Sequence, residues 1–287
     1  MLTSTASPWL APLCVGTQLC GAGEVADIAP ELARAGYKAL ELHPLQLAAM
    51  GDLTHRKRLV DAFHSGGLAI ACAFVGVASD APSTALVSGR CDMAAAVGAE
   101  LVFLVPASRK SGTFEDMAAQ VRQVGRHAGE LGLEVAVHNH AGTYVRTVAE
   151  QLRFLEEVDR PEVGLCLDVA HLALFEDDVV GAIAQLAPHI RYLHVKDLAA
   201  VAREELQGLD GESLEGVAPL TPAYTDIGAG ALDLAAMLGE LARQGYRRWA
   251  TIEIETLRRA TFLEQARENA AQFALLIEPM QEREVRA

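Results

Sequence analysis

The chain has 287 residues, of which 51% are hydrophobic and 22% charged, a composition that excludes a disordered or collagen-like chain. Its 24 basic and 38 acidic residues give a formal net charge of −14, which argues against nucleic acid as a partner. No apolar run approaches the roughly 20 residues that span a bilayer, and the start lacks a signal-peptide pattern, so we expect no membrane association.

A strand followed by a helix is the pattern predicted repeatedly along the chain. In chain order, apolar strand-like runs cover 13–19, 38–43, 68–75, 100–106, 133–140, 163–169, 190–196 and 249–255. Amphipathic helical patterns alternate with them, near 24–35, 54–65, 84–97, 114–131, 147–158, 179–187, 232–244 and 261–277. The alternation predicts a series of strand–helix units.

Turn signals support several of these boundaries. Thr113 and Asp116 have the spacing of a capping box before the helix at 114–131, with Asp where Glu or Gln is usual. Gly98 and Gly132 follow predicted helices, where a left-handed residue suits glycine.

Eight such units predict an α/β fold, a single (β/α)8 TIM barrel spanning 1–287. Continuous apolar strands are typical of a parallel sheet covered on both faces, and the alternation implies right-handed crossovers. A doubly wound dinucleotide-binding fold is disfavoured because no GxGxxG follows the first strand. The one long irregular connection, about 199–227, is expected to lie over the mouth of the barrel.

The cysteines are odd in number and lack metal-type spacing. Such a set indicates reduced, mostly buried thiols in a cytoplasmic protein. They are Cys14, Cys20, Cys72, Cys91 and Cys166.

Polar side chains of metal-binding type end four successive predicted strands. Asp168 follows His138 by 30 residues and precedes His194 by 26, and one barrel unit is about 31 residues long. Glu253 comes one unit plus the long loop later. This spacing places the side chains on one ring at the barrel mouth. Histidine and carboxylate without cysteine suit Mn²⁺, Mg²⁺, Co²⁺ or Zn²⁺. The candidates at these strand ends are His138, His140, Asp168, His194, Glu253 and Glu255.

The alternative is that these residues are ordinary structure, as a lone polar residue at a strand end usually is. Charged residues inside apolar strands argue otherwise, because burying a charge unpaired costs several kcal/mol. Glu41 is expected to face the substrate or support the ligands, and His43 to face either the solvent or the substrate site. Asp197 is expected only to cap or to orient His194, and Glu255 to contact substrate or pair with a neighbouring base.

Six segments together carry a resemblance to a known family. They are GYKALELH (36–43), VHNHAGT (137–143), LCLDVAHLAL (165–174), YLHVKD (192–197), DIGAGALDL (226–234) and WATIEIE (249–255). On these motifs the chain resembles the xylose isomerase-like TIM-barrel superfamily of sugar isomerases, epimerases and inosose dehydratases, from about residue 13 to 277.

The resemblance implies a divalent metal at the barrel mouth, held by His138, Asp168, His194 and Glu253. It also implies a substrate-contacting role for His171, and Lys196 lies on the strand face of His194. His138 departs from the pattern, since most members have Glu there, and a similar His-rich stretch belongs to inosose dehydratase-like members. With two carboxylates instead of three, the bound ion polarises a carbonyl more strongly.

The resemblance implies an isomerase or epimerase acting on a small polyol or keto-sugar through a metal-stabilised enediolate. Glu253 moves the α-proton, and His140, His171 or Lys196 serves as the acid. In the family's epimerases two glutamates act as bases on opposite faces of the substrate, and His138 takes the place of one of them. This replacement disfavours epimerisation and favours either a proton shift on one face or loss of water.

Alternatives stay open on the same residues. An inosose-type dehydratase shares the first step, and a degenerate site would leave a non-catalytic sugar-binding barrel. The related DNA endonucleases are disfavoured, because no Asp-x-His pair precedes Ile227. Barrels of this kind often pair, so a homo-oligomer also stays open.

Overall fold

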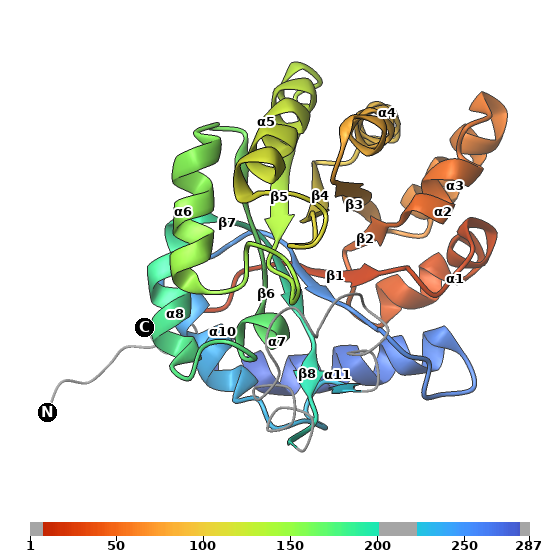
Figure 1. Cartoon of the computed structure of the whole chain (residues 1–287). Coiled ribbons are helices and arrows are strands. Elements are labelled where there is room, and N and C mark those ends of the chain that lie inside the picture. Colours follow the sequence, from red (N-terminus) through yellow and green to blue (C-terminus); the bar gives the residue numbers. More distant parts are fainter. Residues whose placement is uncertain (1–7, 201–222, 282–287) are drawn as a thin grey trace, which may run out of the picture.

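The computed structural model describes residues 8–200 and 223–281, and in it the predicted strands form a closed parallel barrel (Figure 1). The order around the barrel is β1-β10-β7-β6-β5-β4-β3-β2, so the last strand closes on the first. The predicted single (β/α)8 architecture is confirmed. The barrel strands are β1 (Leu13–Gly16), β2 (Ala39–Leu42), β3 (Ala69–Ala78), β4 (Leu101–Pro106), β5 (Glu134–His138), β6 (Val163–Asp168), β7 (Ile190–Val195) and β10 (Ala250–Ile252).

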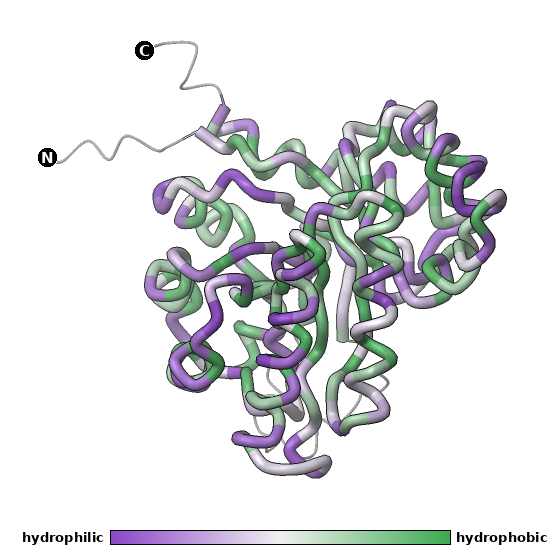
Figure 2. The backbone as a smooth tube through the Cα atoms, turned by 90° about the horizontal axis from the view of Figure 1, so that it is seen from above, coloured by the Kyte–Doolittle hydropathy of each residue, from purple (hydrophilic) through white to green (hydrophobic). Residues whose placement is uncertain are grey.

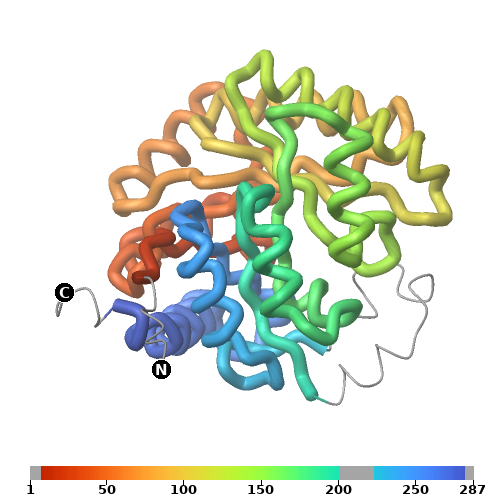
Figure 3. Tube along the Cα trace, turned by 90° about the vertical axis from the view of Figure 1, so that its left-hand side faces the viewer, coloured from red at the N-terminus to blue at the C-terminus, as the bar shows by residue number. Residues whose placement is uncertain are grey.

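Helices surround the barrel, and hydrophobic and hydrophilic residues alternate along their outer turns (Figure 2). The C-terminal helix α11 lies beside the N-terminal segment and closes the helical layer (Figure 3). The helices are α1 (Ala22–Arg34), α2 (Pro44–Ala49), α3 (Leu53–Ser65), α4 (Ala81–Ala96), α5 (Phe114–Glu130), α6 (Val148–Val158), α7 (Val169–Leu172), α8 (Val179–Leu186), α10 (Leu234–Arg243) and α11 (Phe262–Gln281), with a 3-10 turn η1 (Ala187–His189).

Local sequence signals define the ends of these helices. The Thr113 hydroxyl accepts a hydrogen bond from the Asp116 amide, and the Asp116 carboxylate accepts one from the Thr113 amide, so the predicted capping box is confirmed. Gly98 and Gly132 have φ of 79° and 77°, the left-handed conformation predicted for them after a helix.

The core has two layers. One lies between the barrel and the helices, and the other fills the barrel itself with side chains such as Leu101, Phe103, Cys166 and Tyr192. Because the interior is filled, a small molecule can enter only at the mouth. All five cysteines are buried and none forms a disulfide, as the sequence analysis predicted.

Three strands end two or three residues earlier than predicted: β1 at Gly16, β5 at His138 and β10 at Ile252. β5 ends at His138 because the Asn139 side chain replaces the ladder: its Oδ1 accepts from the Asp168 amide at 2.7 Å and its Nδ2 donates to the Asp168 carbonyl at 3.1 Å. β10 ends at Ile252, so Glu253 lies just beyond the last strand rather than within it.

The flanks of the long loop pair with each other. β8 (Asp197–Leu198) and β9 (Tyr224–Thr225) form an antiparallel ribbon, which the sequence analysis did not predict. Most of the loop expected at 199–227 lies outside the described residues. Across residues 8–200 and 223–281, no helix combines the length and hydrophobicity that a membrane span requires.

Candidate metal centre and active site

Four side chains predicted from strand spacing meet at the mouth of the barrel. His138 and Asp168 end β5 and β6, His194 lies in β7, and Glu253 follows β10. One potential ligand atom from each lies within 4.8 Å of the other three. The first three residues are buried, and the Glu253 side chain is 11% exposed. The ring expected from the sequence is therefore present as a geometric group.

Backbone amides orient the Asp168 carboxylate. Its Oδ1 accepts hydrogen bonds of 2.9 Å from the amides of Ala170 and His171 at the start of α7. Its Oδ2 is turned toward the ring, 3.5 Å from His138 Nε2. Although burial alone would raise the pKa of Asp168, Lys196 and His138 hold it well below its usual range.

Glu41 orients His194 from behind, as expected for a supporting residue. Its Oε2 lies 2.8 Å from His194 Nε2 and its Oε1 lies 3.0 Å from His43 Nε2. Burial would raise the pKa of Glu41, but His194 and His43 bring it to about 2, so the carboxylate stays ionised. His194 Nδ1 therefore faces the ring, 3.2 Å from Glu253 Oε2.

These four residues fit a divalent cation. The buried Asp168 Oδ2 and His194 Nδ1 form no hydrogen bond with any described residue and have ionic contacts only, Asp168 Oδ2 with Lys196 Nζ at 3.0 Å and His194 Nδ1 with Glu253 Oε2 at 3.2 Å. Buried polar atoms without a hydrogen bond are costly, and two of them beside two further ligand-type side chains favour a cation that would coordinate them. Imidazole and carboxylate together suit Zn²⁺, Mn²⁺ or Co²⁺.

Lys196 brings a buried ammonium group to the same place. The residue is 1% exposed, and its Nζ lies 2.7 Å from Glu253 Oε2, 2.7 Å from Glu255 Oε1 and 3.0 Å from Asp168 Oδ2. Burial would lower the pKa of Lys196, but Asp168, Glu253 and Glu255 raise it, so the group is charged. Glu255 therefore forms an ion pair with this ammonium group.

Two further histidines line the site as neutral imidazoles. Burial lowers the pKa of His140 to about 4, and burial holds the pKa of His171 well below its usual value. His171 Nε2 lies 2.9 Å from the Tyr224 hydroxyl. Tyr224 was not predicted, because only the pairing of β8 with β9 brings it to the mouth.

A cavity of about 240 Å³ opens over this group. Its wall includes a stacked pair, Phe74 and Phe103, with ring centroids 4.7 Å apart. Sequence patterns gave no signal for this role, since aromatic residues in strands are typical of core. The Gln18 amide also lines the cavity, and its Nε2 donates to the Ile254 carbonyl at 3.0 Å. Seven of the predicted residues lie in the wall: His43, His138, His140, His171, Lys196, Glu253 and Glu255.

Asp197 anchors the turn that follows β9. Its carboxylate accepts hydrogen bonds from the amides of Gly228, Gly230 and Leu232 at 3.0–3.1 Å. A Cβ at Gly230 would lie 2.1 Å from Asp197 Oδ1, so this position excludes a side chain. The Gly228-Ala229-Gly230 sequence of the segment DIGAGALDL (226–234) therefore lets the backbone wrap around this carboxylate.

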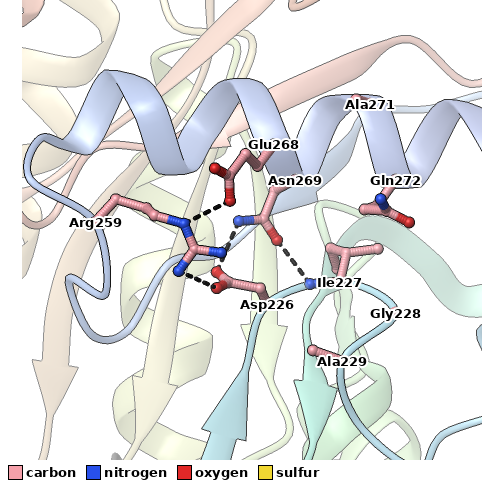
Figure 4. A pocket seen from close by; sticks show the side chains of 9 residues that line it. All are labelled: Asp226, Ile227, Gly228, Ala229, Arg259, Glu268, Asn269, Ala271 and Gln272. Carbon is pink, nitrogen blue, oxygen red and sulfur yellow. Dashed lines mark hydrogen bonds and ion pairs between the residues drawn. The ribbon is translucent and has the colours of Figure 1, made fainter.

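A second cavity, about 390 Å³, lies between this turn and α11 (Figure 4). Its charged groups are already paired: Arg259 contacts Glu268 at 2.6 Å, and Asn269 Nδ2 donates to Asp226 at 2.9 Å. Asn269 Oδ1 accepts from the Ile227 amide at 2.7 Å. These contacts fix the turn on α11 and account for the polar residues there.

Comparison with known proteins agrees with the resemblance read from the motifs. The family model described as xylose isomerase-like TIM barrel matches residues 29–277. An inosose dehydratase of Mesomycoplasma hyopneumoniae is 31% identical over 156 residues, which cover 54% of this chain and 51% of that protein. The chain thus spans about half the length of the curated relatives it matches.

Solved structures show the same fold. An L-ribulose 3-epimerase matches with a TM-score of 0.72 and 18% identity, covering 95% of this chain and 96% of its own. The IolI protein with a bound zinc atom matches with a TM-score of 0.71 and 17% identity, covering 93% and 98%. The predicted family and fold are confirmed.

Proposed function

The chain belongs to the xylose isomerase-like TIM-barrel family, and from this we propose that it is a divalent-metal-dependent enzyme acting on a small keto-polyol. The reaction begins with removal of the proton next to a ketone and ends with loss of water from the neighbouring carbon. The observation that carries the proposal is one ionised carboxylate, Glu253, and one ammonium, Lys196, 2.7 Å apart beside a group fit for a cation. The relatives named inosose dehydratase support the same outcome.

His138, Asp168, His194 and Glu253 would hold the cation. When bound, it acts as a Lewis acid that polarises the ketone and makes the adjacent C–H bond more acidic. Glu41 keeps His194 in the orientation this requires, because it occupies the other ring nitrogen.

Glu253 is the proposed base. Burial alone would raise its pKa, but Lys196 and His194 hold that pKa well below its usual value, so the carboxylate is ionised and its lone pairs are free of a proton. Asp168 is less suited to this role, because its Oδ1 accepts hydrogen bonds from the backbone amides of Ala170 and His171.

Lys196 is the proposed acid. It carries a proton at Nζ within hydrogen-bond distance of Glu253, so a hydroxyl leaving next to the reacting carbon lies within its reach. The pair of His171 and Tyr224 offers a second polar contact for substrate hydroxyls. If the metal occupies the lone pair of His138, this imidazole cannot accept a proton as the second carboxylate of a two-base epimerase would, which favours elimination.

An isomerase or epimerase is the second candidate. Lys196 contacts both Glu253 and Glu255, so a proton taken on one face could return to the neighbouring carbon on that face. The fold-level likeness to L-ribulose 3-epimerase is compatible with this outcome.

Product mass and isotope content test the proposal. The protein is incubated with Mn²⁺ and a keto-inositol in deuterated water, with Asp168→Ala as the matched variant. A product lighter by one water, absent with Asp168→Ala, is the expected result. Deuterium uptake without mass loss would favour the isomerase, and an unchanged substrate would contradict both.

We further propose that the protein works in the reducing cytoplasm. Its five cysteines are free and buried, including three inside the barrel, and buried free thiols are typical of reducing compartments. Non-reducing peptide mapping of protein purified under alkylating conditions tests this, and a disulfide-linked pair would contradict it.

A further inference from the structure

A cysteine lies directly below the proposed metal centre. Cys166 precedes Asp168 by two residues on β6, so both side chains point to the same face of the strand, the barrel interior. The register pairs Cys166 with His138 of β5, and Cys166 is fully buried. Its thiol therefore occupies the layer beneath the Asp168 carboxylate.

The thiol forms a second group with two of the proposed ligands. The Cys166 Sγ and one nitrogen each of His138 and His194 all lie within 4.8 Å of one another. The carboxylates of Asp168 and Glu253 share the two imidazoles but do not join the sulfur in one group. Two overlapping donor sets thus lie one above the other, an upper one with carboxylates and a lower one with sulfur.

The two sets differ in the cations that they favour. Thiolate is a soft ligand that selects thiophilic ions, whereas carboxylates suit harder ions such as Mn²⁺ and Mg²⁺. Since both sets use His138 and His194, a single ion occupies one position or the other.

We propose that His138, Cys166 and His194 form a deeper position of this centre, which takes thiophilic divalent cations such as Cd²⁺ and displaces Mn²⁺ from the carboxylates above. The inference rests on the proposed function, because the imidazoles are those of the proposed metal site. Binding there breaks the S–H bond, forms a metal–sulfur bond and releases the proton to the buffer, with no change of oxidation state. Thiophilic ions are then inhibitors that compete with the working metal.

The test uses Cd²⁺ as the probe and Mn²⁺ as its competitor. Metal-free protein is titrated with Cd²⁺ while the thiolate-to-metal charge-transfer absorbance in the ultraviolet is followed. Wild type is expected to gain this band, Cys166→Ser to lack it, and Cys72→Ser to keep it. Cys72 is the matched control because it is also buried inside the barrel but belongs to neither donor set.

Paramagnetic resonance of Mn²⁺ gives a second readout that does not depend on activity. Cd²⁺ is expected to release Mn²⁺ from wild type, and Cys166→Ser to require at least about 10-fold more Cd²⁺ for the same release. Absence of the charge-transfer band in wild type, which needs no variant, would overturn the deeper position.

The two proposals fail in different ways. Protein that binds Mn²⁺ and turns over substrate but gives no sulfur band with Cd²⁺ refutes only the deeper position. Protein that gives the band but binds no Mn²⁺ refutes the proposed working metal site and supports the deeper position. Protein that binds neither ion refutes both.

Discussion

Replacing Lys196 by methionine would remove the buried ammonium that neutralises the mouth of the barrel. The substitution keeps most of the side-chain volume, so its main effect is electrostatic. In wild type, Nζ lies within 3.0 Å of carboxylate oxygens of Asp168, Glu253 and Glu255. In Lys196→Met these carboxylates would repel one another.

The expected loss of stability follows from the burial of the partners. Removing one member of a buried ion pair typically costs 3–5 kcal/mol. The Asp168 side chain is 0% exposed, but those of Glu253 and Glu255 are 11% and 12% exposed, and water there reduces the penalty. We therefore expect Lys196→Met to lose about 3 kcal/mol when no metal is present.

Guanidinium unfolding with and without metal measures this effect. A bound divalent cation replaces the missing positive charge, so Mn²⁺ should stabilise Lys196→Met more than it stabilises wild type. Turnover should be lost in either case, because the proposed acid is gone. Lys38→Met, at an exposed position, is the control and should stay within about 0.5 kcal/mol of wild type. A Lys196→Met protein as stable as wild type in chelator would refute the reasoning.

Three further variants test the supporting residues. Glu41→Gln removes the carboxylate that orients His194, so Mn²⁺ affinity by calorimetry should fall about 10–100-fold, and an unchanged affinity would count against that role. Asp197→Ala leaves three amides, that of Leu232 buried, without their acceptor and should lower the free energy of unfolding by about 2 kcal/mol; equal denaturation midpoints would contradict this. Burial would raise the pKa of Glu150, but Arg146 holds it below 4.5, so its stabilisation exists above that pH and disappears as the pH falls further. The stability gap between wild type and Glu150→Gln should therefore shrink below pH 4.5, and a constant gap would argue otherwise.

The barrel and the ring of polar side chains at its mouth could be predicted from the sequence, because both depend on features that recur at regular intervals along the chain. Continuous apolar runs alternating with amphipathic helices leave few other topologies, and one-unit intervals place His138, Asp168 and His194 at the same height. The place of Glu253 in the ring was predicted because this residue lies near the end of the last apolar run. The ring thus needed only strand positions, without knowledge of side-chain conformations.

Features that depend on contacts between distant elements could not be predicted. Lys196 lies among three carboxylates because β6, β7 and the segment after β10 converge, and no local pattern encodes that distance. Tyr224 reaches His171 only because β8 and β9 pair. Asn139, read as part of a strand, instead bridges β5 to β6 through its amide.

An anomalous scattering map of crystals grown with Mn²⁺ would test the metal centre most directly. We expect one strong peak within bonding distance of His138, Asp168, His194 and Glu253, and its disappearance in Asp168→Ala. A wild-type map with no peak among these four side chains, at an Mn²⁺ concentration that saturates related enzymes, would contradict the proposed centre.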